Sequence, residues 1–135
     1  MAKSRRRYVL ERAQERCEYC QLPQANSVLP HEVDHIRAQK HHGRDNIENL
    51  CLACAFCNAF KGTNVAGYDP QSGALVPLFN PRRDAWRDHF VWRRAVLVGK
   101  TASARATIDV LRINDPDRVA HRQSLISLSV FPPVD

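Results

Sequence analysis

The chain has 135 residues, of which 44% are hydrophobic and 25% charged, with a formal net charge of +6 and a pI near 9.4. This composition indicates one soluble globular domain, and no apolar run approaches the roughly 18 residues that a membrane span needs. The basic start, MAKSRRRYVLERAQ, has no apolar secretory core, so we expect a cytoplasmic protein with no membrane partner. The positive charge favours an acidic partner, with nucleic acid as the first candidate.

The first half of the chain predicts two helices around a hairpin. We expect the first helix at 4–16 and the second at 55–61. The two strands of the hairpin are expected between them, at 31–36 and 49–53. Ser4 can cap the first helix, and Gly62 stops the second. The residues between the strands, KHHGRDNIE, suit a long turn.

The second half is less regular. Three prolines and three glycines between Gly62 and Pro81 predict mostly loop, with a short strand near 75–79. AWRDHFVW and AVLVG predict further strands, or a helix edge and a strand, and SARATIDVLRI predicts a helix. Asp115 followed by Pro116 begins a last helix. We expect one α+β domain, 1–135, in which 63–135 form an α/β extension.

Two C-x2-C pairs lie on either side of the predicted hairpin. They are Cys17 with Cys20, and Cys54 with Cys57. In a cytoplasmic protein this paired spacing predicts one structural Zn²⁺ held by four thiolates, which stabilises the fold directly. The alternative is four unrelated buried or redox cysteines. Cys51 stands outside the pairs, and we expect it to be a small buried residue.

The motifs CEYC at 17–20, VDHI at 33–36, ENL at 48–50 and CAFCNAFK at 54–61 together resemble the HNH endonucleases. These are the zinc-stabilised branch of the ββα-metal, or His-Me finger, nucleases. The resemblance implies a ββα-metal core over 17–62, under half of the chain. It also implies metal-dependent hydrolysis of DNA phosphodiester bonds.

The resemblance implies a role for each matching polar residue. His35 would be the general base, and Asp34 and Asn58 would hold a catalytic Mg²⁺ or Mn²⁺. Asn49 would hold the hairpin loop and orient His35 through hydrogen bonds. The alternatives are a polar strand face for Asp34 and His35, a helix cap for Asn58 and an ordinary turn residue at Asn49.

General chemistry supports the same roles. Neutral imidazole, with an ordinary pKa of about 6.5, suits a base that works near neutral pH. Asp and Asn offer the hard oxygen ligands that Mg²⁺ and Mn²⁺ prefer. Two features depart from the family pattern: Asn58 stands where some members have histidine, and the usual glycine-rich link is KHHGRDN. His41 and His42 therefore either approach a metal or phosphate, or are solvated loop residues, whereas we expect His31 to be structural or exposed at the rim of the site.

Basic residues supply candidate contacts to nucleic acid. The residues that we expect to reach phosphates are Lys61, Arg82, Arg83 and Arg87. Trp86, Phe90 and Trp92 are interleaved with arginines and are either stacking platforms or core residues. The substrate class stays open among duplex DNA, single strands and RNA, and oligomeric state cannot be read from the sequence. The rival functions are a nucleic-acid-binding module without turnover and a zinc-stabilised protein-interaction domain.

Overall fold

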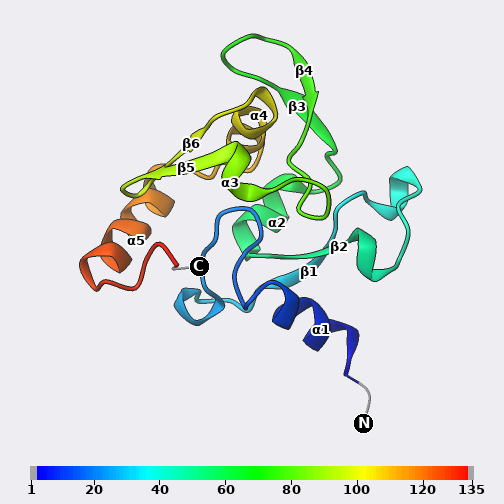
Figure 1. Cartoon of the computed structure of the whole chain (residues 1–135), viewed down its shortest axis with the longest axis horizontal. Helices are drawn as coiled ribbons and strands as arrows, with labels where there is room; N and C mark the ends of the chain where they lie inside the picture. Colours follow the sequence, from blue (N-terminus) through cyan, green and yellow to red (C-terminus); the bar gives the residue numbers. More distant parts are fainter. Residues whose placement is uncertain (1–2, 134–135) are drawn as a thin grey trace.

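The computed structural model describes residues 3–133 as short helices and three two-stranded antiparallel sheets, which is an α+β arrangement as predicted (Figure 1). The helices are α1 Arg5–Arg12, α2 Ala55–Lys61, α3 Trp86–His89, α4 Ala102–Val110 and α5 Pro116–Ser127. The strands are β1 Glu32–His35, β2 Leu50–Ala53, β3 Ala66–Tyr68, β4 Leu75–Pro77, β5 Phe90–Arg93 and β6 Val96–Gly99. Within residues 3–133, none of the helices combines the length and the apolar composition that a membrane span requires.

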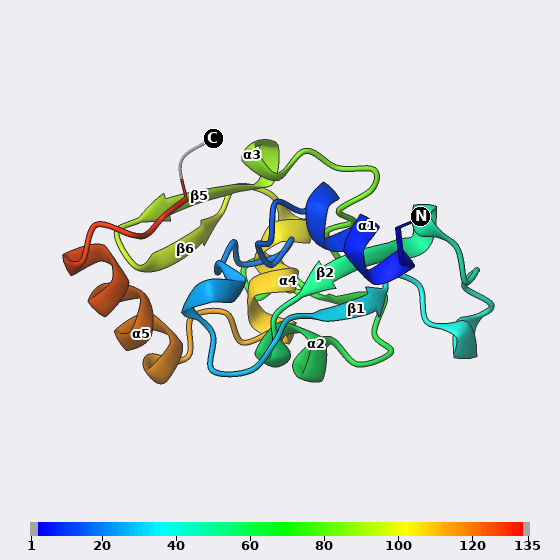
Figure 2. The ribbon, with the colours of Figure 1, turned by 90° about the horizontal axis from the view of Figure 1, so that it is seen from below.

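The β1–β2 hairpin lies between α1 and α2, which contact opposite sides of it (Figure 2). Leu50 and Leu52 pack with Val9 of α1. In the antiparallel register of the two strands, Asp34 lies opposite Cys51, and His35 lies opposite Leu50. Because side chains alternate along a strand, Asp34 faces the α2 side and the neighbouring His35 faces the α1 side.

The first helix is shorter than the predicted range 4–16, because it ends at Arg12. Its start is as predicted, since the Ser4 hydroxyl accepts a hydrogen bond from the Arg7 amide at 3.1 Å. Gln14 and Glu15 both adopt φ of 56°, which breaks the helix. The chain thereby turns just before Cys17 and enters the first cysteine pair.

The short strand predicted near 75–79 is confirmed as β4, but the loop predicted before it was wrong in part, because it contains β3, which pairs with β4. Gly67 of β3 lies directly against α4. A Cβ there would be 2.6 Å from Cγ2 of Val110, so the close approach requires glycine. AWRDHFVW is neither all strand nor all helix, since it contains α3 followed by β5.

The extension and the N-terminal half share one hydrophobic cluster. Cys17 and Cys57 belong to it together with Phe90, Leu111 and Leu125. The two tryptophans are partly buried against the same cluster, and their indole N–H groups donate to the Tyr19 carbonyl and the Gln21 side chain, each at 2.8 Å. These rings therefore serve as core residues, which was the alternative to base stacking.

Candidate metal centre and active site

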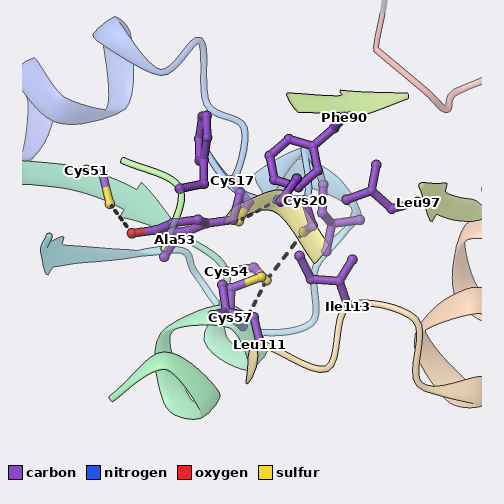
Figure 3. Packing of buried hydrophobic residues seen from close by; sticks show 14 of the residues in the cluster. Cys17, Cys20, Cys51, Ala53, Cys54, Cys57, Phe90, Leu97, Leu111 and Ile113 are labelled. Atoms are coloured by element: carbon purple, nitrogen blue, oxygen red, sulfur yellow. Dashed lines mark hydrogen bonds between the residues drawn. The ribbon is translucent and has the colours of Figure 1, made fainter. Parts of the chain in front are cut away.

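Four buried cysteines meet between the turn after α1 and the start of α2 (Figure 3). Their sulfur atoms all lie within 4.8 Å of one another, and Cys20 and Cys54 Sγ are 3.7 Å apart. A tetrahedral zinc with Zn–S bonds of about 2.3 Å requires S–S separations of about 3.8 Å. Within each pair, the amide of the second cysteine donates to the sulfur of the first at 3.4 Å. This geometry fits a structural metal such as zinc.

Burial makes the ionisation of these thiols dependent on a positive charge beside them. Hydrogen bonds from the other three cysteines hold the pKa of Cys20 well below its ordinary value. Burial raises the pKa of Cys17 and of Cys57 well above theirs. Four buried sulfurs cannot all ionise without positive charge beside them, and a divalent metal supplies it.

Arg118 of α5 supplies further positive charge to this centre. Its Nη2 lies 3.1 Å from Cys57 Sγ and 3.7 Å from Cys54 Sγ, and its Nη1 donates to the Leu111 carbonyl at 2.8 Å. Arg118 is only 8% exposed. Burial lowers the pKa of its guanidinium, but the charges of Cys57, Cys20 and Cys54 raise it more, so the group stays charged. The C-terminal extension therefore neutralises part of the thiolate charge.

Cys51 is separate from the four clustered cysteines, as predicted. It is fully buried and lies apart from the other four cysteines (Figure 3), and its sulfur is 3.7 Å from the Tyr19 hydroxyl. Burial raises the pKa of the Cys51 thiol, with smaller contributions from the charges of Asp34 and Glu18. Cys51 is accordingly a protonated core residue.

His35 ends β1 and has a partly exposed side chain, with 28% of its surface accessible. Its Nε2 lies 2.8 Å from Oδ1 of Asp45, in the loop between β1 and β2. Asp45 also contacts Arg5 of α1, whose Nη2 is 2.5 Å from the same oxygen. One nitrogen of the His35 ring is thus engaged by a carboxylate, and the ring reaches solvent.

Asn49 links the two ends of the β1–β2 loop. Its Oδ1 accepts from the Arg37 amide at 3.0 Å, and its Nδ2 donates to the carbonyls of Arg37 at 2.9 Å and Arg44 at 2.7 Å. Three hydrogen bonds make this side chain a fixed part of the loop. No direct Asn49–His35 bond accompanies them among residues 3–133, so any effect of Asn49 on His35 passes through the loop.

Asp34 points toward α2 and pairs with a buried lysine. Its Oδ2 lies 3.0 Å from Nζ of Lys61, which also donates to the His35 carbonyl at 3.0 Å. Lys61 is 2% exposed. Burial raises the pKa of Asp34, and Lys61 partly opposes this rise. Phosphate binding by Lys61 stays a prediction, because its ammonium group is directed to Asp34.

Asn58 lies on α2 with its amide donating to the carboxylate of Glu32. The alternative of a capping Asn58 is wrong, because Cys54 caps α2 by accepting from the Cys57 amide. Glu32 is two residues from Asp34 and therefore on the same face of β1. Glu32, Asp34 and Asn58 supply oxygen atoms on the α2 side of the hairpin, whereas His35 lies on the other side.

A groove of about 1560 Å³ runs between the β1–β2 loop and residues 77–84. Its lining contains six arginine or lysine side chains and only two acidic ones. The basic residues are Arg12, Arg37, Arg44, Lys61, Arg82 and Arg83, and the acidic ones are Glu48 and Asp84. His41, His42 and Asn49 also line it.

The three arginines predicted to bind nucleic acid lie in different settings. Arg82 pairs with the carboxylate of Glu18, which also accepts from the Leu52 amide at 2.7 Å. Arg83 is exposed and lines the groove. Arg87 is exposed on α3 and does not contribute to the groove lining.

Sequence reasoning missed four residues that contact the candidate site. Glu32 could have been found, because an acid two positions before Asp34 on an alternating strand shares its face. Asp45 and Glu18 carry no local signal that sets them apart from other loop acids. Arg118 is 61 positions from Cys57, and its role depends on how α5 packs.

Comparison with known proteins gives a match for the segment that contains Asp34, His35, Asn49 and Asn58. A family model described as HNH endonuclease matches residues 17–64. The chain is also 27% identical over 129 residues to Septu protein PtuB of Bacillus thuringiensis, covering 94% of this chain and 48% of that protein. The chain thus spans about half the length of the curated relative that it matches. No solved structure gives a significant match.

Proposed function

We propose that this chain, whose residues 17–64 match the family model described as HNH endonuclease, is a metal-dependent endonuclease that hydrolyses DNA. The observation that carries the proposal is His35, a solvent-accessible imidazole at the end of β1 inside the matched segment. Its Nε2 contacts a carboxylate, which leaves the second nitrogen of the ring for a water molecule.

The reaction requires a base on one side of the phosphorus. His35 takes a proton from a water molecule, whose oxygen then forms a bond to phosphorus. The bond from phosphorus to the 3′ oxygen breaks, and its electron pair stays on that oxygen, which takes a proton from solvent. The products carry a 5′ phosphate and a 3′ hydroxyl. His35 releases its proton to solvent and returns to the neutral form.

Asp34 and Asn58 would hold the catalytic Mg²⁺ or Mn²⁺. Their oxygen atoms are of the type that these ions prefer, and Glu32 adds a carboxylate beside Asn58. When bound, the ion would supply positive charge next to the reacting phosphate. Asn49 would keep the loop between the strands in place.

The basic groove supports a nucleic acid as the substrate. It borders the β1–β2 loop and the end of α2, and its cations outnumber its acids by three to one. Such a surface binds phosphodiester backbones through charge and without reading the base sequence. Residues 77–84 belong to the extension, so binding would involve both halves of the chain.

Plasmid cleavage tests the proposal. Zinc-loaded protein should nick or linearise supercoiled plasmid when Mg²⁺ or Mn²⁺ is present and not in its absence. His35→Ala should keep its zinc and its fold but lose cleavage by at least about 100-fold, which is the usual effect of a general base. Equal cleavage by both proteins would reject His35 as the base. Single-stranded DNA and RNA should be tested in parallel.

One observation favours the rival function of a nucleic-acid-binding module without turnover. Lys61 already satisfies Asp34, so the carboxylate does not need a metal. If the wild type and His35→Ala both shift the plasmid on a gel but leave every substrate intact with every metal, the binding module replaces the nuclease as the proposed function.

A further inference from the structure

We infer that Asp45 is a positioning residue for His35, and that it holds the ring in the tautomer whose proton is on Nε2. The inference rests on the proposed function for its catalytic meaning. Its structural basis is independent of that function. Asp45 lies ten residues from His35, within the matched segment 17–64 but outside the motifs VDHI and ENL that flank the loop.

The contact itself assigns the tautomer. Nε2 of His35 lies 2.8 Å from Oδ1 of Asp45. An ionised carboxylate only accepts hydrogen bonds, so Nε2 must carry the proton in this contact. In the neutral ring the lone pair is then on Nδ1. Nδ1 is therefore the atom that takes the proton from water.

Arg5 keeps Asp45 in its charged form and in place. Its Nη2 lies 2.5 Å from Oδ1 of Asp45, and its Nη1 donates to the Asp45 carbonyl at 3.3 Å. The hydrogen bond from His35 lowers the pKa of Asp45, and the charge of Arg5 lowers it further. The N-terminal helix α1 is thereby connected to the candidate base through one carboxylate.

The path of the loop explains how Asp45 reaches His35. Gly43 packs so tightly that a Cβ would lie 1.7 Å from the Arg37 carbonyl oxygen. Only glycine fits there, and the loop can fold back on its own start. The Asn49 side chain fixes both Arg37 and Arg44, the residue directly before Asp45. Asp45 is therefore held in two ways. Arg5 and His35 contact its side chain, and Asn49 holds the preceding residue, Arg44.

Asp45→Asn is the variant that separates positioning from folding. It keeps the size of the side chain, but its amide can donate to Nε2 and so permits a proton on Nδ1. The matched control is Asp88→Asn, which makes the same substitution at an exposed acid of α3 that does not line the groove. Both proteins should first be shown to contain as much zinc as the wild type.

Two measurements on the zinc-loaded full-length proteins test the inference. The ¹⁵N chemical shifts of the His35 ring, identified by their loss in His35→Ala, report which nitrogen carries the proton. We expect Nε2–H in the wild type and in Asp88→Asn, and a substantial Nδ1–H population in Asp45→Asn. We also expect Asp45→Asn to lower kcat for plasmid cleavage about 10- to 100-fold with a much smaller change in KM.

The outcomes separate this inference from the proposed function. A wild-type ring protonated on Nδ1 would overturn it, and so would an Asp45→Asn protein with unchanged tautomer and kcat. If no protein cleaves any substrate but the tautomer changes as expected, the role of Asp45 stands and the nuclease proposal fails.

Discussion

The ammonium group of Lys61 lies 3.0 Å from the carboxylate of Asp34, and both side chains are buried. This ion pair lies where the resemblance to HNH endonucleases expects a divalent ion. Lys61 and such an ion would share or compete for the same oxygen atoms. The metal-dependent nuclease requires a divalent ion at Asp34, whereas the binding module without turnover does not. The two candidate functions therefore make opposite predictions for this ion pair.

Lys61→Met should destabilise the metal-free site and strengthen binding of a divalent ion. Removing one partner of a buried ion pair typically costs about 3 to 5 kcal/mol of unfolding free energy, because the other charge stays buried. We expect a loss of that size by urea denaturation without Mn²⁺, and tighter Mn²⁺ binding than in the wild type by calorimetry.

Lys100→Met is the control, since Lys100 is exposed in the turn after β6. It should change neither stability nor Mn²⁺ affinity by a measurable amount. If Lys61→Met binds Mn²⁺ no better than the wild type, the ion does not bind at Asp34. This result would support the rival function, a nucleic-acid-binding module without turnover.

The four clustered cysteines should bind one zinc per chain, and Cys51 should not contribute. Cys57→Ser removes a ligand, and we expect it to lose stoichiometric zinc and to unfold, because structural zinc binding is part of the folding free energy. Cys51→Ala should keep one zinc and lose only about 1 kcal/mol of stability. Metal analysis after gel filtration and circular dichroism measure both. Zinc loss in Cys51→Ala would contradict the assignment of ligands.

The parts of the fold and of the metal centre that could be predicted are those that depend on residues close together in the sequence. The two C-x2-C pairs, the alternation in 31–36 and the cap at Ser4 each depend on residues close in sequence, and each appears in the structure. The strand predicted near 75–79 is present as β4, but the end of α1 and strand β3 were missed. They depend on the turn into Cys17 and on the packing of Gly67 against α4.

The partners of the candidate site residues could not be predicted, because they come from distant segments. Lys61 was expected to face a phosphate, but its long side chain folds back to Asp34, 27 positions earlier. Asp45 reaches His35 only because the loop closes on Gly43. Sequence patterns place residues on the face of an element, and they do not specify which loop or helix covers that face.

Arg118→Met should make the zinc easier to remove without abolishing its binding. The guanidinium hydrogen bonds to Cys57 and Cys54 are lost, and the buried thiolates lose a counter-charge. Loss of such an outer contact typically weakens metal affinity about 10- to 100-fold. Zinc release to a chromophoric chelator should be correspondingly faster. Arg93→Met, an exposed arginine on β5, should release zinc at the wild-type rate. Equal rates in both variants would show that Arg118 only packs.

Arg83→Ala should weaken nucleic-acid binding in a way that depends on salt. Arg83 is exposed on the groove wall, and its guanidinium has no partner among residues 3–133. Each phosphate contact adds about 0.9 to the slope of log K against log salt for duplex DNA, and about 0.7 for a single strand. Loss of one contact should therefore lower the slope by about 1 on a duplex, with little dependence on base sequence.

The binding should be measured by fluorescence anisotropy at several salt concentrations, with His35→Ala in every protein so that the probe stays intact. Arg93→Ala is the matched control, because Arg93 is exposed but does not line the groove. If the two arginine variants lower the slope equally, binding follows the overall charge of the chain. A loss confined to Arg83→Ala would instead locate a phosphate between the β1–β2 loop and residues 77–84, because Arg83 contributes to that wall.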